Sequence, residues 1–181
     1  NPWPAACVDA IRERGVPTVM GNHDRAVAAG TSFRFNSMAA AGVEHAREKL
    51  DDDAVAWLAE LPDSRTVLDG RVKLVHGHPE DPDRYTYPEE FSARMLDGED
   101  VLVTGHTHVQ GHETFEEGIV MNPGSVGQPR DGDPRAAYAL VDLDDRTVEE
   151  RRVEYDVDRV AEAVREAGLP DRIGERLSEG R

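Results

Sequence analysis

Five of the seven histidines in this 181-residue chain lie in three short turns that also contain glycine. The turns read "GNHD" at residues 21–24, "HGH" at 76–78 and "GHTH" at 105–108. Each turn directly follows a short apolar run that predicts a buried strand. Loops at the strand ends of an α/β sheet come together from distant parts of the chain. The three turns are therefore expected to face one another.

These turns supply the donor atoms that borderline divalent metal ions prefer. They contain one amide oxygen and five imidazoles, from Asn22, His23, His76, His78, His106 and His108. Histidines two positions apart in extended backbone point to opposite sides, but a tight turn at Gly105 can bring His106 and His108 together. Mixed nitrogen and oxygen ligands suit Mn, Fe, Co, Ni or Zn. A structural zinc site is disfavoured, because such sites use cysteine and the chain has only Cys7.

The elements that must position these turns alternate along the chain and predict a single α/β domain over residues 1–181. Neither an internal repeat nor a linker is evident. Helices are expected over 4–14, 35–49, 53–61, 88–96 and 156–178, the last broken near Gly168 and Pro170. Strands are expected at 17–20, in a hairpin around Asp69 and Gly70 whose second arm is 72–75, at 101–104, and within 118–126, 136–144 and 147–156.

The composition narrows the functional classes. The chain has 37 acidic and 21 basic residues, a net charge of −16, and only two lysines, Lys49 and Lys73. This pattern suits the cytoplasm of a salt-loving organism, with an ordinary acidic bacterial protein as the alternative. An acidic surface disfavours broad nucleic-acid binding. Apolar runs are too short to cross a membrane, so we expect a cytoplasmic protein, with Cys7 as a small buried residue.

Three motifs in a fixed order carry a resemblance to a known family. "GNHD", "LVHGHP" and "VTGHTH" resemble the third, fourth and fifth motifs of the calcineurin-like metallophosphoesterases. "NPWP", "WLAELP" and "NPGSVGQPRDGDPRAAYAL" resemble the small, largely prokaryotic phosphodiesterase branch. The resemblance implies a four-layer α-β-β-α sandwich of two mixed sheets flanked by helices.

The resemblance also implies a site for two divalent ions. Asn22, His76 and His106 would bind one ion, and His108 would bind the other. Manganese is the first expectation for the metal, with Fe, Ni, Co, Zn or Mg as alternatives. His78 matches no usual ligand of the family and is expected at the rim of the pocket or in solvent.

The activity implied is hydrolysis of a phosphodiester, or of a monoester, by water activated between the two ions. His23 matches the histidine that meets the phosphate, and Asp24 would orient it. The partner is then a small phosphoester substrate. A non-catalytic binding module on the same fold is one alternative, disfavoured by the histidine at position 23. A dinucleotide polyphosphate hydrolase is another, and these motifs do not separate it from a phosphodiesterase.

Two further segments could shape the pocket. The polar loop 80–90 offers Arg84, Tyr85 and Tyr87 as substrate contacts, although it could equally be a solvated connection. The "GSVGQPR" turn after Asn122 could form a pocket wall or serve only as a turn.

The family also has an Asp-x-His motif and a Gly-Asp motif near its start, and this chain contains neither. In relatives, "NPWP" comes soon after the Gly-Asp motif. We therefore expect that an N-terminal part with the first strand or strands is absent from this chain. The chain alone is expected to have impaired activity.

Overall fold

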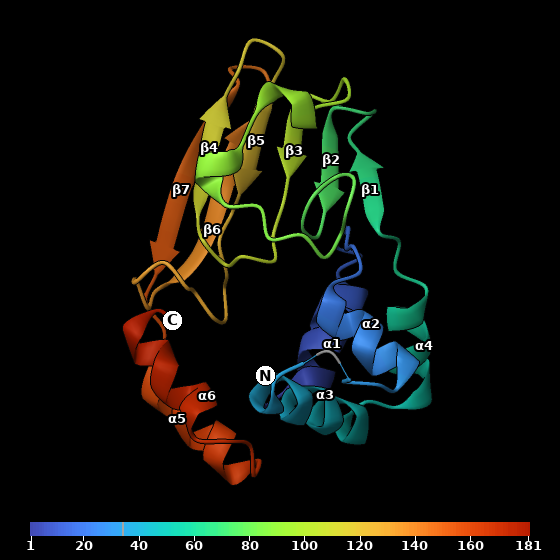
Figure 1. Ribbon diagram of the computed structural model, residues 1–181, viewed down its shortest axis with the longest axis vertical. Helices are drawn as coiled ribbons and strands as arrows, with labels where there is room; N and C mark the ends of the chain where they lie inside the picture. Colours follow the sequence, from blue (N-terminus) through green and yellow to red (C-terminus); the bar gives the residue numbers. More distant parts are fainter. Residues whose placement is uncertain (34) are drawn as a thin grey trace.

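The fold is built around a five-stranded mixed sheet, in a computed structural model that describes residues 1–33 and 35–181 (Figure 1). The strand order is β1-β2-β3-β5-β4. The three inner strands β2, β3 and β5 run parallel to one another, whereas β1 and β4 pair antiparallel at the two edges. The strands are β1 (Ser64–Val67), β2 (Val72–Val75), β3 (Val101–Val103), β4 (Gly111–Thr114) and β5 (Ile119–Asn122).

Both faces of this sheet are covered. A two-stranded antiparallel sheet, β6 (Ala136–Asp142) and β7 (Thr147–Val153), packs on the face that includes Val101, Ile119 and Met121. The opposite face, with Leu102 and Val120, packs against Phe91 and Met95 from a segment with two short 3₁₀ helices. Successive residues of β3 and β5 therefore point to opposite faces, as a pleated strand requires. The two helices are η1 (Pro88–Glu90) and η2 (Ala93–Met95).

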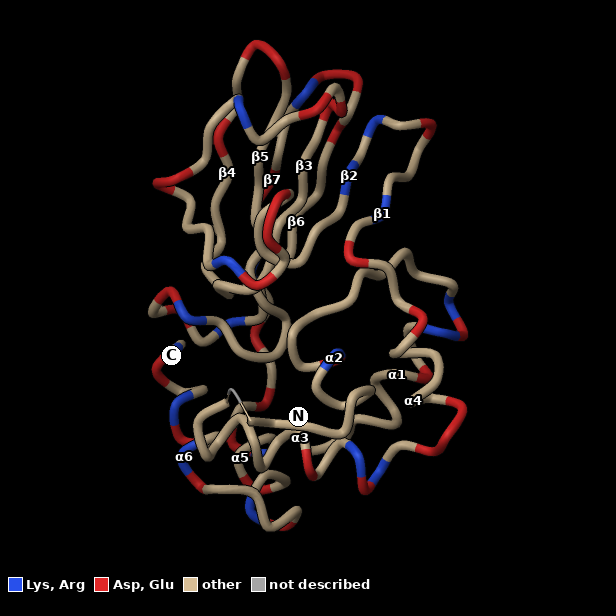
Figure 2. The backbone as a smooth tube through the Cα atoms, turned by 45° about the vertical axis from the view of Figure 1, so that its right-hand side comes forward, with Lys and Arg blue, Asp and Glu red and all other residues tan. Residues whose placement is uncertain are grey.

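Four helices form a second core beyond the carboxyl ends of the parallel strands (Figure 1). They are α1 (Pro4–Glu13), α2 (Asn22–Ala29), α3 (Ser37–Lys49) and α4 (Asp52–Ala59). Buried Val27, Val43 and Leu58 hold them together. The chain ends in α5 (Val157–Glu166), α6 (Arg172–Glu175) and η3 (Arg176–Glu179). Figure 2 shows that acidic positions are spread over loops and helices in both halves of the molecule.

Helix α2 is the element that brings the first turn to the sheet. Gly21 is its N-cap, and the Asp24 carboxylate accepts a hydrogen bond from the Gly21 N–H at 2.8 Å. Gly30 ends the helix in the left-handed conformation, with φ of +67°, which glycine adopts without a steric penalty. The expected turn at residues 21–24 is instead the N-cap and the start of a helix.

Much of the predicted order of elements is confirmed, including the α/β class and a mixed central sheet flanked by helices. Two local predictions are wrong, and one strand was missed. Residues 17–20 form no strand, although Met20 N–H donates to the Pro62 carbonyl at 2.9 Å. The helix expected at 88–96 is the pair of 3₁₀ turns, and β4 was not predicted.

Two other details differ from expectation. The second sheet was expected to be mixed, but in the described part of the chain it is the antiparallel pair β6–β7. Cys7 is exposed on α1 instead of buried. Across residues 1–33 and 35–181, no helix has the length and apolar character needed to cross a bilayer.

Replacing Leu102 with Ala should strongly destabilise the fold, because its side chain is 0% exposed at the centre of the sheet. We expect the free energy of unfolding to fall by about 2–5 kcal/mol, since the substitution leaves a cavity. The measurement is a urea denaturation curve. The control is Leu140→Ala, at a position that is 52% exposed. It should change the free energy of unfolding by less than about 1 kcal/mol. Equal effects of the two variants would contradict this account of the core.

Candidate functional site

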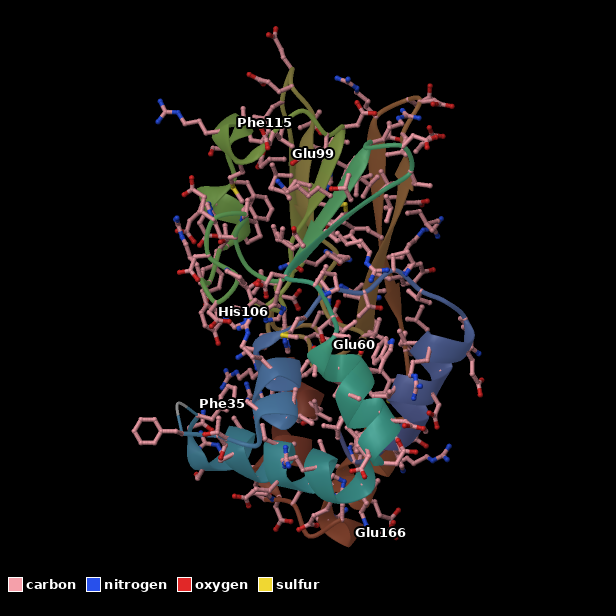
Figure 3. The ribbon with its side chains drawn as sticks, turned by 90° about the vertical axis from the view of Figure 1, so that its right-hand side faces the viewer. Phe35, Glu60, Glu99, His106, Phe115 and Glu166 are labelled. Carbon is pink, nitrogen blue, oxygen red and sulfur yellow. The ribbon has the colours of Figure 1, made fainter. Side chains whose placement is uncertain are left out.

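The carboxyl ends of β2 and β3 are joined by a hydrogen bond that places two histidines side by side. Gly105 N–H donates to the His76 carbonyl at 2.8 Å and so extends the parallel pairing past the strands. This bond brings the rings of His76 and His106 next to each other, with centroids 4.5 Å apart. Figure 3 shows His106 at the junction between the strands and the helices.

The first residue of α2 approaches the same point from the helical side. The Asn22 Oδ1 lies 3.1 Å from the His76 Nε2. Gly21 permits this approach, because a Cβ at that position would lie 3.0 Å from Asp24 Oδ2 and 3.2 Å from His76 Cε1. Two donor atoms that each lie about 2.1 Å from one ion are roughly 3 Å apart or more. The separation of Asn22 and His76 is thus compatible with a shared ion.

His106 and His108 both have left-handed backbone, with φ of +64° and +62°. Such conformations are uncommon for residues with a side chain and cost about 1–3 kcal/mol each. Fully buried Asn122, at the end of β5, offsets this cost by holding the turn. Its Nδ2 donates to the Gly105 carbonyl at 2.8 Å and to Thr107 Oγ1 at 2.9 Å, while its Oδ1 accepts from Gly124 N–H at 2.9 Å.

Two of the imidazoles are oriented by backbone carbonyls. His108 Nδ1 lies 2.7 Å from the Gln128 carbonyl, and His106 Nε2 lies 3.1 Å from the Asp83 carbonyl. A carbonyl only accepts, so the nitrogen that faces it carries the hydrogen in each ring. The other nitrogen of each ring then has a free lone pair. This is the arrangement by which metal-binding histidines are usually oriented.

The histidines are also held in the neutral form. Burial, together with neighbouring His106, lowers the pKa of His76 to about 4. Burial and the guanidinium of Arg130 lower the pKa of His108 to about 4. The pKa values of His106 and His23 are lowered as well, chiefly by burial. Neutral imidazoles at neutral pH can bind a metal ion without first losing a proton.

The donor chemistry therefore fits a divalent ion, whereas the side chains do not form a closed cage. Among residues 1–33 and 35–181, no group of three or more His, Cys, Asp and Glu side chains is placed to hold an ion. Asparagine is not among those four residue types, so the Asn22 amide oxygen near His76 is a further possible donor. His108 is near enough to lower the pKa of His76. These four residues are thus gathered, but they would need further oxygen donors to surround two ions.

His23 and Asp24 occupy the first turn of α2 but make different contacts. The His23 ring reaches the surface and stacks on Phe35, with centroids 4.6 Å apart. The Asp24 carboxylate is bound to Gly21 N–H, and burial raises its pKa. In the described part of the chain, the hydrogen bonds of Asp24 do not include one to His23. Asp24 holds the helix start, and its role in orienting His23 stays a prediction.

The loop 80–90 contacts the histidines. The Tyr85 ring lies over His106, with centroids 4.0 Å apart, and stacks on Tyr87 at 6.3 Å. Arg84 pairs with Glu90 at 3.5 Å. His78 Nδ1 accepts a hydrogen bond from Glu80 N–H at 3.2 Å, so this half-buried histidine organises its own turn.

Two residues near the site were not predicted as functional. Asn122 ends the apolar run of β5, and a buried polar side chain in such a place needs hydrogen-bond partners, which is the signal that could have identified it. Arg130 lies close enough to His23, His106 and His108 to lower the pKa of each. The signal for Arg130 was weak, because the chain is rich in arginine.

Comparisons with known proteins place the chain in a family. The family described as the calcineurin-like phosphoesterase superfamily domain matches residues 3–146. An uncharacterized protein of Methanocaldococcus jannaschii is 31% identical over 198 residues, which cover 98% of this chain and 81% of that protein. The phosphodiesterase YfcE of Escherichia coli K12 is 42% identical over 74 residues, which cover 41% of this chain and 35% of YfcE.

Solved structures share the fold over nearly the whole chain. A metallophosphoesterase from Sphaerobacter thermophilus superposes with a TM-score of 0.84 at 32% identity, covering 99% of this chain and 83% of that one. A hypothetical protein from Pyrococcus horikoshii has the same fold, with a TM-score of 0.85 at 21% identity over 99% of this chain and 81% of that one. With the family match over residues 3–146, these similarities show that the chain belongs to the calcineurin-like phosphoesterase superfamily.

Proposed function

We propose that this protein is a metal-dependent phosphoesterase that hydrolyses phosphodiester bonds in small substrates, with monoesters as less favoured substrates. The observation that carries the proposal is the meeting of Asn22, His76 and His106 at the ends of α2, β2 and β3. Membership of the superfamily supports a phosphoester substrate and divalent metal ions. The name of the E. coli relative supports the preference for diesters.

Asn22, His76 and His106 would hold one ion, and His108 would contribute to a second, with manganese as the proposed metal. When bound, such ions polarise the phosphoryl group and make water a nucleophile near neutral pH. The Gln128 carbonyl faces His108 Nδ1, which leaves His108 Nε2 to bind an ion. The Asp83 carbonyl faces His106 Nε2, which leaves His106 Nδ1 to bind an ion. The chain would thus orient these two proposed ligands through backbone contacts.

His23 would act on the phosphoryl group. It lies in the first turn of α2, where the helix dipole favours a negatively charged group. Its lowered pKa leaves a neutral ring whose N–H can donate to a phosphoryl oxygen. The charge of a bound phosphoester would raise that pKa again and so favour donation of a proton to the leaving group. Asp24 fixes the helix start that positions His23.

Replacing His76 with Ala should reduce both metal content and hydrolysis, because it removes the donor that faces Asn22 and His106. We expect about 10-fold or greater loss of metal affinity. The measurements are metal stoichiometry by elemental analysis and kcat on bis-p-nitrophenyl phosphate. His112→Ala is the matched control. His112 lies on β4 and pairs with Glu150 on β7 at 2.7 Å, so it is not one of the proposed ligands. A His76 variant with full metal content would exclude this residue as a ligand.

Replacing His23 with Ala should separate metal binding from turnover. Metal content should stay close to that of the unchanged protein, because the His23 ring stacks on Phe35 and is proposed to meet the phosphoryl group, not the metal ion. Turnover should fall by about two to four orders of magnitude, the range expected for loss of a proton donor or a transition-state hydrogen bond. The same two measurements apply. Full activity in this variant would show that the proposed role of His23 is incorrect.

A further inference from the structure

The loop 80–90 holds two tyrosines in solvent beside the candidate histidines. Tyr85 and Tyr87 are 47% and 39% exposed, whereas Thr86 between them is 1% exposed. Tyr87 has extended backbone, with φ of −83° and ψ of 158°. Side chains two positions apart in extended backbone point to the same side, so both rings lie on the outer side of the loop. Two of the four tyrosines in the chain are thus exposed at one place.

The two tyrosine rings form a row that begins at His106. The Tyr85 and His106 ring centroids are 4.0 Å apart, and the ring planes are tilted by 40°. The Tyr87 ring follows, with its centroid 6.3 Å from that of Tyr85 and its plane at 24° to that ring. Aromatic rings attract one another at centroid separations of about 4.5–7 Å. The row therefore presents an exposed aromatic surface that adjoins the histidines.

Tyr85 contacts His106 without using the edge of the imidazole that would bind a metal ion. The lone pair of a ring nitrogen lies in the plane of the imidazole, whereas Tyr85 lies over its face. The Asp83 carbonyl faces His106 Nε2 at 3.1 Å, so Nδ1 is the nitrogen with the free lone pair. A phosphoryl group bound through an ion at Nδ1 would have the Tyr85 ring as a neighbour. Tyr85 is thus positioned to contact the group that the phosphate carries.

Contacts with α2 and with the turn after β2 hold this loop in place. Arg25 on α2 donates to the Asp83 carboxylate at 2.8 Å. The loop backbone also lies directly against the turn after β2, because a Cβ at Gly77 would lie 2.6 Å from the Pro82 carbonyl oxygen. Glycine at position 77 therefore admits the loop, whereas a side chain there would displace it. A surface that is already ordered loses little conformational entropy when a ligand binds.

We propose that Tyr85, extended by Tyr87, is a stacking surface for the planar base of a nucleotide-class phosphoester. The inference rests on the proposed phosphoesterase function for the position of the phosphate. A nucleobase stacks on an aromatic ring whatever its sequence identity, because every base has a π-face. Tyrosine suits an exposed surface of this kind, since its hydroxyl keeps one end of the ring hydrated. The ligand is a small nucleotide and not a polymer, because a net charge of −16 repels polyanions.

Binding of two phosphomonoesters that differ in the base tests this surface without relying on turnover. The probes are adenosine 5′-monophosphate and ribose 5-phosphate, titrated calorimetrically into the intact protein with manganese in constant excess. The unchanged protein should bind the nucleotide about 10-fold more tightly, the order expected for one base stacked on an aromatic ring. Tyr85→Ala should remove most of this preference and change ribose 5-phosphate binding by less than about twofold.

Two further variants separate stacking from simple packing. Tyr85→Phe should retain the preference to within about twofold, because the ring face is kept. Tyr85→Leu should lose the preference, because leucine is apolar but not planar. Tyr138→Ala is the matched control, since Tyr138 lies on β6 and is similarly exposed, at 38%. It should leave both affinities unchanged.

Equal binding of the two probes by the unchanged protein, including binding of neither, would overturn the inference. An equal loss of both probes in Tyr85→Ala would also overturn it, because Tyr85 would then only support His106. If Tyr85→Ala does not fold, as judged by its melting temperature, the Phe and Leu variants decide the question. Hydrolysis of bis-p-nitrophenyl phosphate by the unchanged protein tests the proposed function separately. A nucleotide preference without hydrolysis counts against that function alone, and hydrolysis without the preference counts against the stacking surface alone.

Discussion

The hydrogen bond between Gly105 N–H and the His76 carbonyl is the contact on which the site depends. It extends the parallel pairing of β2 and β3 by one step, from strand into turn. Parallel neighbours end at the same edge of a sheet, so the residues that follow them are brought together without a long loop. His76 and His106 are adjacent for this reason. Helix α2 then needs to supply only Asn22 and His23 from the other side.

The sequence predicted the parts of the site that strand periodicity controls. Apolar runs that end in a glycine and a histidine placed two turns correctly at the ends of β2 and β3. The pattern does not predict α2, because "GNHD" has the composition of a turn, although Gly21 and Asp24 serve as the N-cap and the third residue of the helix. The prediction of a strand at 17–20 is wrong. A short apolar run forms a strand only beside a neighbouring strand, and the pattern of a single sequence does not show whether that neighbour exists.

Other features depend on contacts between distant residues and could not be read from local patterns. Asn122 stabilises a turn that lies 15 residues earlier in the chain, and Gln128 orients His108 from 20 residues away. β4 is short and polar, and only its pairing with β5 identifies it as a strand. The left-handed backbone of His106 and His108 is likewise a consequence of these contacts. Glycine would adopt that backbone with less strain, but it would provide no imidazole.

The net charge of the chain repels an anionic phosphoester, whereas the proposed site must attract it. A chain of net charge −16 repels an anionic substrate. Salt screens charges beyond about 8 Å at physiological ionic strength, so distant surface carboxylates contribute little to the potential inside the site. Nearby groups therefore decide the local potential. Burial keeps His76 and His108 neutral, so in the protein alone the positive charge beside them comes from Arg130. That charge would favour a phosphate group at the histidines, while the acidic surface keeps the rest of the molecule unattractive to polyanions.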